Sequence, residues 1–107
     1  MKPTSLTPEQ RETLLLEELQ KLLDGSTSQG EVLSALRRKV LGFNQTQYAQ
    51  LVGVSRRTLS DIERDTGNIT VETLNRVFRP LGLQLGLLPR QRSLLMDLRL
   101  NGSPSDM

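Results

Sequence analysis

Residues 45–64 have the sequence QTQYAQLVGVSRRTLSDIER, and this stretch decides the fold. Tyr48 and Val52 are four residues apart, which predicts one apolar face on a first short helix. Gly53 follows where a helix can end in the left-handed conformation, which glycine adopts without a steric penalty. Ser55 is a favoured N-cap residue for a second helix. We therefore predict two short helices that cross steeply at a glycine turn.

The second predicted helix begins with two adjacent arginines, Arg56 and Arg57. Leu59 and Ile62 are three residues apart and share an inward face, so the arginines lie on the outward side. A short, braced helix with cations at its start fits the DNA major groove and can reach base edges. The sequence therefore favours a DNA-binding protein.

These residues resemble the helix-turn-helix of the lambda-Cro/XRE regulators. Small Ala49 and the turn residue Gly53 agree with that pattern, and so do the apolar residues at its buried positions: Tyr48, Val52, Val54, Leu59 and Ile62. The similarity covers roughly residues 30–90. It implies an all-α, lambda-repressor-like bundle. Within the family, the chain looks most like the HipB-type antitoxins, which repress their own operons and associate with a kinase-like toxin.

The composition is compatible with one small helical domain. The chain has 107 residues, of which 36% are hydrophobic and 3% aromatic. It contains no Cys and no His, which excludes disulfides and thiolate metal sites and removes the commonest general base. We therefore expect no catalytic residues, no cofactor and no metal. No segment approaches about 20 consecutive apolar residues and no leader is evident, so we expect a cytoplasmic protein.

The positive charge is concentrated in the segment that carries the motif. Residues 30–90 hold nine basic and five acidic side chains, a net charge of +4. Residues 1–29 hold three basic and five acidic side chains, a net charge of −2. This distribution suits a polyanionic partner, although an ordinary solvated surface would explain it as well.

Three segments are expected along the chain: residues 1–28 as an acidic helix with a linker, 29–90 as the helix-turn-helix domain, and 91–107 as a partly disordered tail. Thr7 and Gln10 predict a capping box that starts the first helix, which we expect near residues 7–24. This helix is unlike the HipB-type pattern. We expect this helix either to bind a partner protein or to pack on the small core.

A strand is predicted after the last helix of the motif domain. Leu83, Leu85 and Leu87 alternate along residues 83–89 and would share one face. A single strand cannot satisfy its own hydrogen bonds, and no other segment offers a second strand. The simplest solution is the same strand from a second copy, which predicts a homodimer. The leucines of the tail could extend this interface or bind a partner, and residues 101–106 are expected to be disordered.

The resemblance also implies roles for individual residues. At the start of the second motif helix, Ser55, Arg56, Arg57 and Ser60 would contact bases. Gln45, at the start of the first motif helix, would contact a phosphate or, alternatively, serve only in capping. Thr46 and Thr58 are further candidates for phosphate contacts. Arginine suits base recognition because its planar fork donates two hydrogen bonds to guanine. The alternative is that one arginine only neutralises phosphate. Asp61 would accept from a cytosine or orient an arginine.

A structural brace is implied as well. The resembling repressors pair an arginine of the helix before the motif with the glutamate that ends the recognition helix. These positions fall on Arg38 and Glu63. The alternative is that the two are unrelated surface charges.

The leading hypothesis is a dimeric, sequence-specific repressor on a palindromic DNA operator, and the antitoxin of a HipA-like kinase toxin that regulates its own promoter. One alternative is a protein-interaction module that mainly sequesters a toxin or another partner. Another is a stand-alone, phage-type repressor without a toxin. An enzyme is disfavoured because the chain lacks His, Cys and a phosphate-cradling glycine loop.

Overall fold

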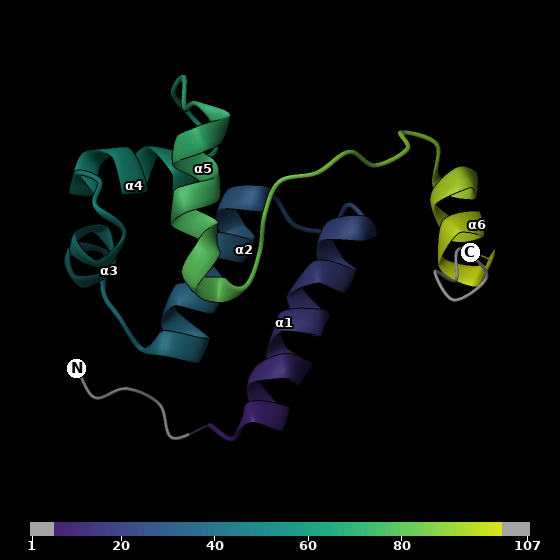
Figure 1. Ribbon diagram of the computed structural model, residues 1–107, viewed down its shortest axis with the longest axis horizontal. Coiled ribbons are helices and arrows are strands. Elements are labelled where there is room, and N and C mark those ends of the chain that lie inside the picture. Colours follow the sequence, from purple (N-terminus) through teal and green to yellow (C-terminus); the bar gives the residue numbers. More distant parts are fainter. Residues whose placement is uncertain (1–5, 102–107) are drawn as a thin grey trace.

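The computed structural model describes residues 6–101. Within them the chain is helical and contains no strand (Figure 1). The α-helices are α1 (Pro8–Leu23), α2 (Gln29–Leu36), α3 (Gln45–Val52), α4 (Arg56–Glu63), α5 (Val71–Phe78) and α6 (Arg92–Asn101). A wider π-helical stretch, η1 (Arg37–Leu41), continues α2, and a 3-10 turn, η2 (Arg79–Leu81), follows α5. The prediction of an all-α bundle is confirmed.

Local sequence signals account for where the helices begin. Thr7 and Gln10 form the predicted capping box at the start of α1. Asn44 caps α3 through another capping box, and Thr70 caps α5. These side chains accept hydrogen bonds from backbone N–H groups that have no partner inside the helix. Pro80 lies in η2, directly after the last residue of α5, because a proline cannot continue the helical hydrogen bonding.

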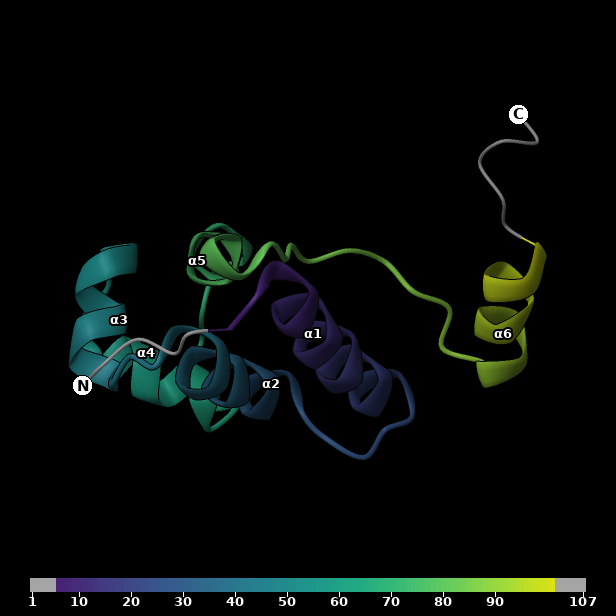
Figure 2. The same cartoon turned by 90° about the horizontal axis from the view of Figure 1, so that it is seen from below.

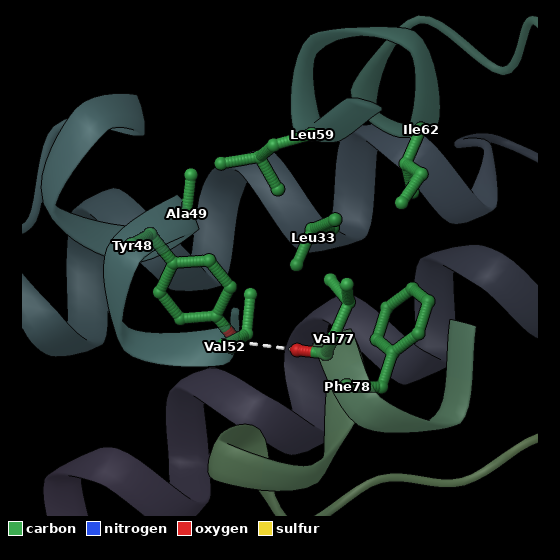
Figure 3. Close-up of a cluster of buried hydrophobic side chains, with 8 residues drawn as sticks. All are labelled: Leu33, Tyr48, Ala49, Val52, Leu59, Ile62, Val77 and Phe78. Carbon is green, nitrogen blue, oxygen red and sulfur yellow. Dashed lines mark hydrogen bonds between the residues drawn. The ribbon is translucent and has the colours of Figure 1, made fainter. Parts of the chain in front are cut away.

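The core lies where α2, α3, α4 and α5 meet (Figure 3). Its buried members are Leu33, Tyr48, Ala49, Val52, Leu59, Ile62, Val77 and Phe78. The Tyr48 hydroxyl donates a hydrogen bond to the Val77 carbonyl oxygen at 2.6 Å, which joins α3 to the end of α5 (Figure 3). Burial, together with the nearby Glu63 charge, raises the pKa of Tyr48, so the phenol stays a neutral donor.

Helix α1 packs beside α2 and η1 (Figures 1 and 2). Its Glu18 carboxylate is only 4% exposed and accepts from Lys21 Nζ at 3.0 Å and from Lys39 Nζ of η1 at 3.4 Å. Burial would raise the pKa of Glu18, but the two lysines outweigh it and lower the pKa. The contact attaches α1 to the bundle. This agrees with the second of the two roles considered for this helix, packing on the core.

The segment that follows η2 is extended and carries no strand ladder within the part of the chain described here. The Leu85 N–H donates to the side-chain carbonyl of Asn75 at 2.8 Å, so an α5 side chain takes the place of a strand partner. Leu83 packs against the core, whereas Leu87 is fully exposed. The segment leads away from the bundle toward α6 (Figure 2). Pairing of residues 83–87 with a second copy stays a prediction.

The first part of the tail is helical. Helix α6 stands apart from the bundle, and an ion pair of 3.7 Å between Arg92 and Asp24 connects its start to the end of α1 (Figure 1). Leu94, Met96 and Leu98 of α6 are exposed. Disorder was predicted for residues 101–106: Asn101 is instead the last residue of α6, and the others lie outside the described residues.

Candidate nucleic-acid interface

The turn between α3 and α4 has the predicted geometry. Gly53 ends α3 with φ of +75°, and its N–H donates to the Ala49 carbonyl oxygen at 2.9 Å. A Cβ built on Gly53 would meet no atom within 4 Å, so the backbone conformation and not space requires glycine. Ala49 is buried and small, and the Val54 N–H donates to its carbonyl oxygen at 3.1 Å. The corner therefore fixes the direction in which α4 leaves α3.

The start of α4 is capped by Ser55. Its Oγ accepts from the Thr58 N–H at 3.0 Å and also lies 2.9 Å from Thr58 Oγ1. These two predicted contact residues thus bind each other at the helix start. Their hydroxyls can still accept or donate one further bond to DNA, since a hydroxyl has one donor and two acceptor sites.

Arg56 and Arg57 lie in the first turn of α4 and are exposed. Across the described residues 6–101, neither guanidinium has a hydrogen-bond or ion-pair partner. The opposite face of α4 is fixed in the core by Leu59 and Ile62. The helix therefore presents two free cations on a rigidly held support, which is the arrangement that major-groove recognition needs.

The outer face of α4 continues with Ser60 and Asp61, both half-buried. Asp61 Oδ1 accepts from Arg64 Nη2 at 2.9 Å, so this carboxylate orients an arginine, one of its two predicted roles. The pair is largely solvated and adds little stability. Arg64 extends the positive charge of α4 beyond its first turn.

The predicted brace involves a different arginine. Glu63 pairs with Arg37, the first residue of η1, and not with Arg38, so the prediction of Arg38 is wrong. Arg37 Nε donates to Glu63 Oε2 at 2.7 Å and Arg37 Nη2 donates to Glu63 Oε1 at 2.9 Å. Both side chains are 7% exposed. Arg37 Nη1 also donates to the Phe43 carbonyl oxygen at 2.8 Å, which holds the loop before α3 in the same group.

Gln45 joins this brace. Its Nε2 donates to Glu63 Oε1 at 3.0 Å, so the side-chain amide predicted to grip a phosphate is directed to the end of α4. Burial would raise the pKa of Glu63, but hydrogen bonds from Arg37 and Gln45 outweigh it and lower the pKa. The Glu63 carboxylate is therefore ionised at neutral pH, and the brace connects η1, α3 and α4. Thr46, the next residue of α3, is exposed.

The apolar periodicity of the preceding helix could have identified Arg37. Arg37 lies four residues after the buried Leu33 and therefore on the same helix face. Arg38 lies four residues after Ser34, to whose Oγ its Nε donates at 3.3 Å, and it is exposed. The resemblance gave the correct helix and the correct glutamate but placed the arginine one residue too late.

The predicted contact residues therefore lie on two adjacent helices, α3 and α4 (Figure 1). Gln45 and Thr46 lie at the start of α3, which meets the Glu63 end of α4, whereas Ser55, Arg56, Arg57 and Thr58 lie at the start of α4 and Ser60 in its middle. Helix starts present free N–H groups and partial positive charge, which suit phosphate. Residues 6–101 hold no group of His, Cys, Asp or Glu that could bind a metal ion. In the same part of the chain, no helix combines the length and apolar character that crossing a membrane requires.

Comparison with known families agrees with this geometry. A helix-turn-helix family model of the Cro/C1 type matches residues 35–88, about half of the chain. The chain belongs to this family and is a DNA-binding transcription regulator of the XRE type. The match begins inside α2 and ends before α6, so α1 and α6 are additions to the shared domain. No curated protein and no solved structure matches the chain.

Proposed function

We propose that this regulator is a sequence-specific repressor and that α4 reads base edges in the major groove. The observation that carries the proposal is the pair of exposed arginines, Arg56 and Arg57, in the first turn of a helix whose other face is buried. Neither has a partner among residues 6–101. A guanidinium that already had a carboxylate partner would have to lose it before binding guanine. These two need no such exchange.

The remaining contacts divide into two classes. Ser60 follows Arg56 on the outer face by one helical turn and is proposed to contact a base. Ser55, at the start of α4, is proposed to contact a base as well. Thr46, Thr58 and the backbone N–H groups at the start of α3 are proposed to bind phosphate. Phosphate contacts fix the position of the protein on the duplex, and base contacts supply the sequence preference.

The proposal includes a homodimer on a palindromic operator, with two α4 helices in successive major grooves about 34–36 Å apart. Residues 83–88 support it because they extend from the bundle and Leu87 is fully exposed. An extended segment with a free edge can pair with its own copy across a two-fold axis.

The finer prediction of a toxin-neutralising antitoxin rests on the resemblance to HipB-type proteins alone. The exposed leucines of α6 offer a surface for a kinase-like toxin or another partner protein. If α6 serves only a protein partner, DNA binding does not need it. Removing residues 91–107 should then leave the operator affinity unchanged.

The base-reading proposal is tested by selecting duplexes from a random pool with the full chain and then measuring variants on the selected operator. Arg56→Ala and Arg57→Ala should each weaken operator binding by about 1–3 kcal/mol, with a smaller loss on scrambled DNA. Arg11→Ala, an exposed arginine of α1, is the control and should change neither. Equal losses on operator and scrambled DNA would show that the arginines only neutralise phosphate.

The dimer is tested by sedimentation of Leu87→Lys. Because Leu87 is fully exposed, this change leaves the monomer intact and should reduce the sedimenting mass to that of one chain. Leu16→Lys, an exposed leucine of α1, is the matched control and should leave the mass unchanged. A Leu87→Lys chain with the wild-type mass would refute pairing through residues 83–88.

A further inference from the structure

The far end of α4, opposite its two arginines, is fastened to the start of α2. Asp65 follows α4 by two residues. Its Oδ1 accepts from the Gly30 N–H at 2.8 Å, and its Oδ2 accepts from the Ser28 hydroxyl at 2.6 Å. One carboxylate thus holds two groups of the first turn of α2. Hydrogen bonds to an ionised acceptor are among the strong ones in proteins.

Gly30 allows an unusually close approach at this point. A Cβ on Gly30 would lie 2.4 Å from the Ile62 carbonyl oxygen and 2.6 Å from the Glu63 carbonyl oxygen. Any larger residue would therefore push the last turn of α4 away from α2. Because the positive end of the α2 dipole faces the negative end of the α4 dipole, the approach is also electrostatically favourable.

The backbone of Asp65 is left-handed at this contact. Its φ is +58°, and within the described part of the chain it is the only residue other than glycine with a positive φ. A residue with a Cβ occupies this region at a cost and stays there when its surroundings impose it. The Asp65 N–H donates to the Ile62 carbonyl oxygen at 3.1 Å and the Thr66 N–H donates to the Asp61 carbonyl oxygen at 2.9 Å, as at many helix ends with a left-handed residue. The two bonds to Ser28 and Gly30 add to these local contacts.

Together with the brace, these bonds connect the C-terminal end of α4 to both ends of α2. Asp65 holds it at the first turn of α2, and Glu63 holds it to Arg37, directly after the last turn. Rotation of α4 about either point alone is blocked by the other. The contacts with α2 therefore restrict the direction of α4 at its end, in addition to the glycine corner at its start.

We propose that Asp65 is a positioning residue for DNA recognition: its bonds to Ser28 and Gly30 set the orientation in which α4 presents Arg56 and Arg57. This inference rests on the proposed function, because it assigns a role in sequence preference. A residue that merely stabilised the fold would affect operator and scrambled DNA alike.

The test uses two variants of Asp65 in the full chain. Asp65→Gly removes the carboxylate and relieves the positive φ, and Asp65→Asn keeps one acceptor but loses the charge. Glu72→Gln, a change at an exposed carboxylate of α5, controls for the loss of one negative charge. Affinities for the selected operator and for a scrambled duplex are measured at a temperature at which circular dichroism shows each variant folded.

We expect Asp65→Gly to lower the preference for operator over scrambled DNA by about tenfold, as for the loss of one well-placed base contact. Asp65→Asn should show a smaller loss, and Glu72→Gln none. An unchanged preference in Asp65→Gly would overturn the proposal, and so would equal losses on both duplexes. If Asp65→Gly does not fold, the preference of Asp65→Asn decides, and a wild-type value overturns the proposal.

A measurement without DNA separates this proposal from the proposed function. Residual dipolar couplings report the angle between α4 and α2, which should change in Asp65→Gly and stay the same in Glu72→Gln. An unchanged angle overturns the positioning role whatever the DNA results. A wild-type chain that selects no sequence from the random pool would refute base reading, while the couplings still decide whether Asp65 orients α4.

Discussion

Replacing Arg37 by alanine is the sharpest test of how the recognition helix is held. The substitution removes two hydrogen bonds to the Glu63 carboxylate and one to the Phe43 carbonyl oxygen. It leaves a carboxylate that is 7% exposed, with hydrogen bonds remaining from Gln45 and from the Ser34 side chain. Removing one partner of a buried ion pair costs about 3–5 kcal/mol, because the other charge loses its compensation.

Arg38→Ala is the matched control, since it removes an adjacent arginine from the same helical segment. Arg38 is exposed and donates only one long bond to Ser34, so the expected loss in unfolding free energy is below about 0.5 kcal/mol. The two variants carry the same change in charge and side-chain type. A difference between them therefore reports the brace.

The assay is urea unfolding followed by far-ultraviolet circular dichroism, with a thermal scan as a second measurement. A loss of 1 kcal/mol lowers the melting temperature by about 4–8 °C in a domain of this size, so Arg37→Ala should lower it by at least about 12 °C. Glu63→Ala and the double variant with Arg37→Ala complete a cycle, and the double variant should be less destabilised than the sum of the two.

A loss below about 1 kcal/mol in Arg37→Ala would refute the reasoning, as would an Arg38→Ala loss of equal size. Additive effects in the cycle would also contradict it, because they would mean that Arg37 and Glu63 do not depend on each other.

Three further predictions concern acid, a buried hydroxyl and the turn. The fold lowers the pKa of Glu63 below its usual value of 4.5, so the charged carboxylate stabilises the protein above that pH. In urea unfolding, the difference in unfolding free energy between wild type and Glu63→Gln should therefore shrink as the pH falls from about 6 to about 3. Tyr48→Phe removes the bond to the Val77 carbonyl oxygen and should lower the free energy of unfolding by about 1–3 kcal/mol. A loss below about 0.5 kcal/mol would argue against this bond. Gly53→Ala should lower the free energy of unfolding by about 1–2 kcal/mol, because alanine disfavours the positive φ of this position. Gly86→Ala is the control: a Cβ there also meets open space but the residue has no positive φ, so urea unfolding should show almost no change.

Much of the fold was predictable because its signals are local. The capping box of Thr7, the caps Asn44 and Ser55 and the left-handed Gly53 each act within a few residues of their position. Such interactions depend on sequence spacing and not on distant segments. The helix starts and the turn followed from them.

Residues 83–89 show where alternation of apolar residues was insufficient. Their leucines predicted a strand, but hydrogen bonding within the chain goes from Leu85 to the Asn75 side chain. A strand is defined by its partner, and the partner of an isolated extended segment is not encoded in its own alternation. Whether a second copy supplies it is the question for the Leu87→Lys experiment.

The contact residues of α4 followed from helical periodicity, because burying Leu59 and Ile62 leaves the arginines on the opposite face. The brace did not follow as fully. Arg37 and Arg38 are neighbours of the same type, and only the direction of the helix face toward Glu63, 26 residues later, distinguishes them. Gln45 likewise lies at the predicted helix start, yet its amide serves the brace.

The amino-acid sequence by itself determined the two helices, the glycine corner and the exposed arginines, because each depends on groups only a few residues apart. The tertiary structure alone decided which arginine neutralises Glu63 and how Asp65 and Gly30 fasten α4 to α2. Those contacts join residues 26 to 37 positions apart, and they form only when the helices have packed. Distance along the chain is the physical reason for the division.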